Sequence, residues 1–141
     1  MKQKDLRRVS EVAKWIYDYG CYFMSLLYSR RIPYSEVATL DDLFEYYDIF
    51  IAKGWMDPDC YVKDPCAILR FLTGKKYIVK KDTKLDPNAD IIIGRWYNPA
   101  TDHFHFVVMD RGNNVIWDSL GYSLTVANGS IESYRLFYEC K

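Results

Sequence analysis

Three short segments of the sequence place a reactive side chain beside neighbours that could activate it: Gly20-Cys21, His103-Phe104-His105 and Trp117-Asp118-Ser119. We expect Cys21 to open a helix, where the helix dipole and the unpaired backbone N–H groups favour a thiolate and lower the pKa of a thiol. The glycine before it would let backbone or substrate come close. A thiolate with a histidine beside it can attack a carbonyl carbon as a nucleophile. The alternative is that Cys21 is a small apolar residue on a buried helix.

The histidine and aspartate segments are expected on neighbouring strands. A hairpin loop of four residues would pair Met109 with Asn114 and His105 with Asp118. Directly opposed side chains are close enough for the carboxylate to accept a hydrogen bond from the imidazole, which fixes its tautomer and orientation. A loop one residue longer would place Ser119 opposite His105 and turn Asp118 to the other face. The alternative to a catalytic pair is a polar pair at a sheet margin.

Zinc binding is the other chemistry that these residue types allow, with Cys60, Cys66, His103 and His105 as ligands. The Cys-x5-Cys spacing is not a usual zinc-knuckle spacing, so we expect no metal and no other cofactor. We expect all four cysteines to be free thiols because no secretory signal is recognisable; they are Cys21, Cys60, Cys66 and Cys140.

The composition limits the classes of partner. The chain has 141 residues, enough for one domain, and we expect a single domain over residues 1–141. Lys plus Arg equals Asp plus Glu, so no excess positive charge favours nucleic acid or an anionic membrane surface. No apolar run is long enough to cross a bilayer, and we expect a cytoplasmic protein. Aromatic residues make up 17%, which favours a tightly packed domain with rings left at a surface cleft.

The elements that must position the reactive residues fall into two groups. Before about residue 75 the apolar spacing is helical. It predicts one helix from Leu6 that ends near Tyr19-Gly20, and further helices at 21–28, 40–51 and 65–73. Thr39 with Asp42 and Asp64 with Pro65 are the expected capping pairs of the last two helices, which are expected to stop at Gly54 and Gly74. The later sequence predicts strands at 77–79, 91–97, 104–109, 115–117 and 134–138. Lysines 75–76 and 80–81 are expected to cover a solvated edge strand. Helices followed by strands indicate an α+β fold with a mostly antiparallel sheet.

Taken together, these segments resemble a known family. The run Tyr19-Gly20-Cys21-Tyr22-Phe23-Met24-Ser25-Leu26-Leu27, with His105-Phe106-Val107-Val108 and Val115-Ile116-Trp117-Asp118-Ser119-Leu120-Gly121, is similar to the Cys, His and Asp blocks of papain-like cysteine peptidases. The similarity is greatest to the bacterial branch that cleaves double-glycine leader peptides and its uncharacterised relatives. It implies N-terminal helices with the cysteine on a buried central helix packed on a C-terminal antiparallel sheet. It also implies Cys21 as nucleophile, His105 as general base and acid, and Asp118 as the orienting residue.

The sequence departs from that family at one position. The family usually carries a Gln about six residues before the Cys as an oxyanion donor, and here that position is Trp15. Losing such a donor costs about 10²- to 10³-fold in rate, which leaves the backbone N–H of Cys21, Trp15 Nε1–H or Tyr19 O–H as substitutes. The resemblance therefore implies a peptidase or amidase acting on a peptide or protein. The alternative is a catalytically silent domain of the same fold that works as a protein-interaction module.

A second likeness is to ubiquitin-like-protein proteases, whose His and Asp strands are similar to His105–Asp110 and Ile116–Gly121. In those enzymes the Cys follows the Asp. Here the only later cysteine is Cys140, one residue from the end of the chain, so this order fits poorly.

Overall fold

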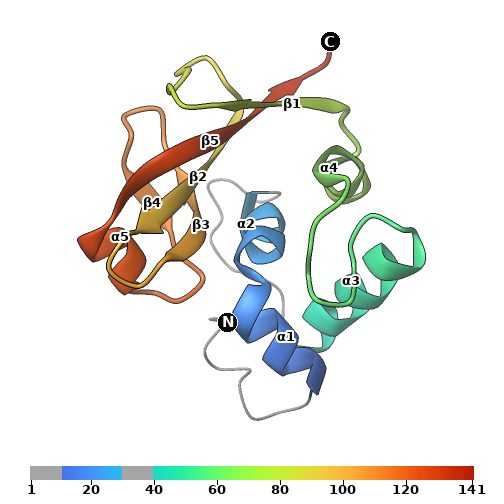
Figure 1. Cartoon of the computed structure of the whole chain (residues 1–141). Helices are drawn as coiled ribbons and strands as arrows, with labels where there is room; N and C mark the ends of the chain where they lie inside the picture. The colour runs from blue at the N-terminus through green and yellow to red at the C-terminus, as the bar shows by residue number, and fades with distance from the viewer. Residues whose placement is uncertain (1–10, 30–39) are drawn as a thin grey trace.

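The computed structural model describes residues 11–29 and 40–141 (Figure 1). Within them, four helices precede the sheet: α1 (Glu11–Tyr19), α2 (Cys21–Ser29), α3 (Leu40–Ala52) and α4 (Pro65–Thr73). The strands are β1 (Tyr77–Asp82), β2 (Ile91–Asn98), β3 (His103–Met109), β4 (Val115–Trp117) and β5 (Ser130–Glu139). They form one antiparallel sheet in the order β1-β5-β2-β3-β4. The predicted α+β fold with an antiparallel sheet is confirmed.

The helix boundaries follow from local capping. Asp64 accepts a hydrogen bond from the N–H of Ala67 at 3.0 Å, Pro65 occupies the first turn of α4, and Gly74 ends it with φ 75°. Gly54, with φ 76°, follows the end of α3. These stops are where the sequence predicts them. The predicted start of the first helix at Leu6 and the capping residue Thr39 lie outside the described residues.

Helix α2 is the centre of the molecule. It lies between the sheet on one side and α3 and α4 on the other (Figure 1), and the side chains from Phe23 to Ser29 are all buried. Phe23 packs edge-on against Phe50 of α3 at a ring separation of 5.8 Å, and Tyr28 stacks on Trp117 of β4 at 4.9 Å. A helix that is apolar nearly all round is buried from all sides, as the sequence predicts. In the described part of the chain, no helix has the length and apolarity needed to cross a bilayer.

A second, smaller core lies on the other face of the sheet, where the short helix α5 (Leu124–Asn128) packs against β2 and β3. Helix α5 was not predicted from the sequence. It has five residues, too few to show a helical period, and its one local signal is Ser123, whose hydroxyl accepts a hydrogen bond from the N–H of Val126.

The predicted register of the β3–β4 hairpin is wrong. Val108 pairs with Trp117 and Met109 pairs with Val115, with an irregularity between them, so Ile116 is an extra residue in β4. The loop between Met109 and Val115 is one residue longer than the predicted four, with Asn113 in a left-handed conformation at φ 68°, and the bulge shifts the register by a second residue. Because β4 ends at Trp117, Asp118 has no place in the ladder opposite His105.

Candidate active site

Cys21 stands in the first turn of α2, immediately after a tight junction with α1. Gly20 is the single residue between the two helices: its N–H donates to the carbonyl of Ile16 and its carbonyl accepts the N–H of Met24, both at 2.8 Å. A Cβ atom at Gly20 would lie 2.4 Å from the Ile16 carbonyl oxygen, so this junction requires a glycine. The sequence pair Gly20-Cys21 therefore places the sulfur at a helix start, as predicted.

The start of α2 is held against an edge of β3. In the described strands β4 pairs only with Val108 and Met109, which leaves the earlier part of β3 open on that side. The N–H of Phe106 forms a hydrogen bond to Cys21, and Ser25 Oγ lies 3.5 Å from the Phe106 carbonyl oxygen while donating to the Cys21 carbonyl at 2.7 Å. The polar backbone groups at this edge are thus satisfied by α2, and Cys21 is placed one residue from His105 along β3.

His105 and Asp118 form a hydrogen-bonded pair with both side chains almost fully buried. Nε2 of His105 lies 2.7 Å from Oδ1 of Asp118, and their residues are 5% and 7% exposed. The turn after β4 fixes the carboxylate: the N–H of Leu120 donates to its Oδ1 and the N–H of Gly121 donates to the Asp118 carbonyl, both at 2.9 Å. The predicted contact between His105 and Asp118 is present, but it arises from the turn after β4 and not from the predicted cross-strand pairing.

His105 also hydrogen-bonds to Cys21. Since Nε2 faces Asp118, Nδ1 is the ring nitrogen left for the sulfur. Burial disfavours the imidazolium, but the hydrogen bonds to Asp118 and Cys21 outweigh it and raise the pKa of His105 to about 10. Burial likewise disfavours the thiolate, but the hydrogen bond and charge of His105, with backbone N–H groups, bring the pKa of Cys21 below its ordinary value. Both shifts favour a thiolate–imidazolium pair.

Asp118 stays ionised beside this pair. Burial alone would raise the pKa of the carboxyl group, but the hydrogen bond and charge of His105 lower it, and the N–H of Leu120 and the hydroxyl of Ser123 lower it further. A carboxylate held in this way fixes the ring of His105 and stabilises its charged form.

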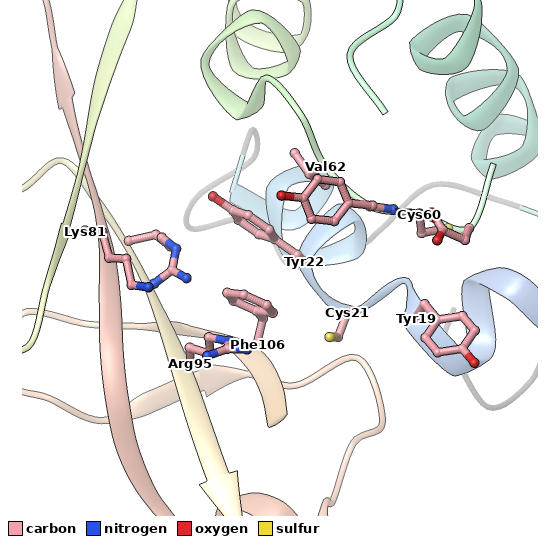
Figure 2. Close-up of a pocket in the computed structure, with 11 residues that line it drawn as sticks. Tyr19, Cys21, Tyr22, Cys60, Val62, Lys81, Arg95 and Phe106 are labelled. Atoms are coloured by element: carbon pink, nitrogen blue, oxygen red, sulfur yellow. Dashed lines mark hydrogen bonds between the residues drawn. The ribbon is translucent and has the colours of Figure 1, made fainter. Parts of the chain in front are cut away.

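A pocket of about 490 Å³ opens beside the sulfur (Figure 2). Tyr19, Tyr22 and Phe106 line it around Cys21, residues 59–62 form the wall opposite the sheet, and strand residues close the far side. The rings of Tyr22 and Phe106 are stacked at 4.5 Å. Cys21 is half-buried and borders the pocket, while Trp15, at the position of the missing Gln, is 37% exposed and is not part of the lining.

Comparison with known proteins gives the family of the chain. A family model described as "Protein of unknown function, DUF261" matches residues 1–139. The chain belongs to this family. No curated protein and no solved structure matches it.

The other cysteines and histidines of this DUF261 chain do not gather into a second site. In residues 11–29 and 40–141, no three His, Cys, Asp or Glu side chains gather as a metal site, and the set Cys60, Cys66, His103 and His105, considered for zinc, forms no such group. Cys60 is buried with φ 69°, and burial raises the pKa of its thiol to about 12. Cys140 follows β5, where its N–H donates to Lys76 beside β1, across the sheet from β3. The cysteine that His105 contacts is Cys21, which contradicts the order of the ubiquitin-like-protein proteases.

Three cations on the sheet side of the pocket were not predicted as site residues: Lys81, Arg95 and Arg135. They belong to three strands, and their common direction depends on the pairing of β5 between β1 and β2. Alternation within each strand predicts which residues share a face, but it does not predict which strands are neighbours.

Proposed function

We propose that this protein is a papain-like thiol hydrolase that cleaves a peptide or amide bond with Cys21, His105 and Asp118. The observation that carries the proposal is the position of one buried imidazole, which hydrogen-bonds to a helix-start thiol on one side and to a carboxylate on the other. This three-group arrangement activates a nucleophile and orients its base. It also matches the chain order and the roles that the sequence resemblance implies.

The chemistry follows from the two pKa shifts. The Cys21 thiolate attacks the substrate carbonyl carbon, and the carbonyl π electrons move to the oxygen. The His105 imidazolium then gives its proton to the leaving amine as the C–N bond breaks, leaving an acyl group on the sulfur. The neutral imidazole next takes a proton from water, the resulting hydroxide attacks the thioester, and the thiolate departs. The imidazolium remains paired with it for the next cycle.

The oxyanion requires hydrogen-bond donors beside the sulfur. Of the two side chains expected as substitutes for the missing Gln, Tyr19 lines the pocket and Trp15 does not. We therefore assign the hydroxyl of Tyr19 and the backbone N–H of Cys21 as donors to the developing negative charge. Tyr19 is 57% exposed, so its hydroxyl can move toward a bound substrate.

Two observations favour catalysis over a silent interaction module. A silent domain would be expected to seal the sulfur from solvent or to fill the cleft with Trp15. Instead, Cys21 is half-buried and borders the pocket, and the Trp15 ring lies at a tilt against Tyr19 with ring centroids 5.6 Å apart. The nucleophile is therefore reachable by a substrate.

Acylation by p-nitrophenyl acetate tests the proposal without a specific substrate. We expect a stoichiometric burst of p-nitrophenolate at pH 7, an acetyl group on Cys21 by peptide mass spectrometry, and slow turnover afterwards. Cys21→Ala should abolish the burst and His105→Gln should suppress both phases, while Cys60→Ala and Cys140→Ala should leave the label on Cys21. An absence of acetyl on Cys21, with ester hydrolysis equal in wild type and Cys21→Ala, would refute the proposal.

Amide cleavage separates a peptidase from a domain that can only be acylated. A mixture of denatured-protein peptides is incubated with the wild type and with Cys21→Ala, and new termini are identified by mass spectrometry. We expect new termini with the wild type alone. Acylation by the ester without any new termini would favour the silent-module alternative.

A further inference from the structure

Three basic side chains face the pocket from adjacent strands. Lys81 of β1 is the direct partner of Arg135 of β5, and Arg95 of β2 is the partner of Ser133, two residues before Arg135. All three cations line the same pocket as Cys21. Figure 2 shows Lys81 and Arg95 on the sheet side of the pocket, facing Val62 and Cys60 across it. One end of the pocket is therefore nucleophilic and the other is positively charged.

The three cations differ in how their charge is neutralised. Arg95 is paired with Glu132 at 2.9 Å and lies 3.6 Å from the ring centroid of Phe104. Arg135 donates to the neutral hydroxyl of Ser133 at 2.8 Å and lies 5.4 Å from the ring centroid of Phe106. Neither Arg135 nor Lys81 forms an ion pair within the part of the chain that the structure describes.

Arg135 differs from the other two cations because it is half-buried and has no ion pair in the described residues: Lys81 is exposed, and Arg95, which is also half-buried, is paired with Glu132. Burial of the guanidinium lowers the pKa of Arg135, which shows that the surroundings disfavour its charge. A guanidinium presents five N–H donors in a planar fork that fits a carboxylate, and the hydroxyl of Ser133 uses only part of that capacity. The one carboxylate of the pocket lining is Asp59, which belongs to the wall opposite the sheet. Glu132 favours the charge of Arg135 from a distance but is ion-paired with Arg95, so binding an anion would give Arg135 a countercharge of its own.

We propose that Arg135, with Lys81 beside it, binds a carboxylate of the substrate and so directs Cys21 to acidic peptides. This inference rests on the proposed hydrolase function and names its substrate class. The carboxylate has two possible sources: an acidic side chain near the scissile bond, or the C-terminal carboxylate of a short peptide. Both present the same planar oxygens to the guanidinium. The floor formed by Tyr22 and Phe106 supports the aliphatic part of either group.

The test compares alkylating reagents that differ only in one carboxylate. N-iodoacetyl-glutamate α-amide is compared with N-iodoacetyl-glutamine amide, and N-iodoacetyl-glycine with its amide. The rate of labelling of Cys21 is followed by peptide mass spectrometry at low salt. We expect the acid of at least one pair to react about tenfold faster than its amide in the wild type, the size of a charge-assisted hydrogen bond at a partly exposed site.

Variants test whether the cations cause the faster labelling of Cys21 by the acid reagents. Arg135→Gln should bring the ratio of acid to amide rates close to one, Lys81→Gln should lower it less, and Arg135→Lys should retain part of it. Arg111→Gln, the same change at an exposed residue outside this pocket, should leave the ratio unchanged. Adding salt should reduce the wild-type preference, since solvent-accessible charges are screened. The imidazolium of His105 attracts every anionic reagent in all variants, so its contribution cancels in the comparison.

The outcomes separate the two proposals. A preference in the glutamate pair supports an acidic side chain as ligand, and one in the glycine pair supports a C-terminal carboxylate. Ratios near one in the wild type, or a ratio that survives both Arg135→Gln and Lys81→Gln, overturn the anion site. The ratio is measurable even if every reagent labels Cys21 slowly. Slow labelling at pH 6 with a clear acid preference would therefore count against the hydrolase and in favour of the anion site. If Arg135→Gln fails to fold, Lys81→Gln, at an exposed position, still decides the question.

Discussion

Replacing His105 with glutamine should reveal how strongly the imidazolium holds Cys21 as a thiolate. Glutamine keeps a hydrogen-bond donor for Asp118 but carries no charge. In the wild type, the hydrogen bond and charge of His105 oppose the effect of burial and lower the pKa of Cys21. In His105→Gln only burial and the backbone donors remain, so the pKa of Cys21 should rise and the thiolate should disappear at mildly acidic pH.

The size of the effect follows from thiol ionisation. At pH 6 an ordinary thiol with a pKa of about 8.5 is roughly 0.3% thiolate, so full ionisation raises the thiolate concentration about 300-fold. A thiolate that is fully ionised at pH 6 is also less basic and therefore less nucleophilic, and a Brønsted slope of about 0.4–0.5 takes back roughly 30-fold. The net expectation is that Cys21 of the wild type reacts about tenfold faster than free N-acetylcysteinamide at pH 6. The His105→Gln variant should lose at least that factor.

The assay is iodoacetamide labelling of Cys21 between pH 4 and 11, read by peptide mass spectrometry, with circular dichroism to confirm folding. The wild-type rate should rise at acidic pH as Cys21 ionises and stay nearly level over the neutral range. It should change again only as His105 loses its proton near its pKa of about 10. The variant should show one rise, at alkaline pH. Wild-type and variant rates within about threefold of each other at pH 6 would contradict an ion pair between Cys21 and His105.

Three further predictions concern the supports of the site. Asp118→Asn keeps an acceptor for His105 Nε2 and should retain most of the acylation rate. Asp118→Ala leaves the ring unoriented and should lower the rate at least tenfold, and equal rates for the two would exclude an orienting hydrogen bond. Tyr19→Phe should lower kcat for ester hydrolysis about tenfold with little change in KM, because it removes only an oxyanion donor; an unchanged kcat would exclude that role. Gly20→Ala should lower the free energy of unfolding by about 1–3 kcal/mol in urea titrations, since its Cβ would meet the Ile16 carbonyl oxygen at 2.4 Å. The control Gly112→Ala meets only the ends of side chains, the nearest at 3.1 Å, and should cost less.

The features that local chemistry determines could be predicted from the sequence. The N-cap at Asp64, the left-handed stop at Gly74 and the start of α2 after Gly20 each depend on a few adjacent residues. The separation of helices from strands was predictable for the same reason, because a helical and an alternating apolar period differ over one element. The placement of Cys21 at a helix start needed nothing beyond this local information.

The contacts between elements could not be predicted in the same way. The β3–β4 pairing differs from the expected register because the loop holds one more residue than predicted and a bulge at Ile116 adds another, and no single residue type specifies a bulge. The cation end of the pocket depends on β5 lying between β1 and β2, which brings Lys81 and Arg135 together from sequence positions far apart. Such pairings are decided by the packing of whole strands.

The short β4 explains why Cys21, His105 and Asp118 meet although the register of β3 and β4 differs from the predicted one. Because its ladder ends at Trp117, the earlier edge of β3 stays open, and the backbone of Phe106 takes Cys21 and Ser25 of α2 as hydrogen-bond partners. The same early end leaves Asp118 in a turn, where the backbone N–H of Leu120 holds its carboxylate toward His105. A longer β4 would compete with α2 for this edge and draw Asp118 into a strand. The site therefore depends on a strand that stops early, so that a helix start and a turn can reach the imidazole from two sides.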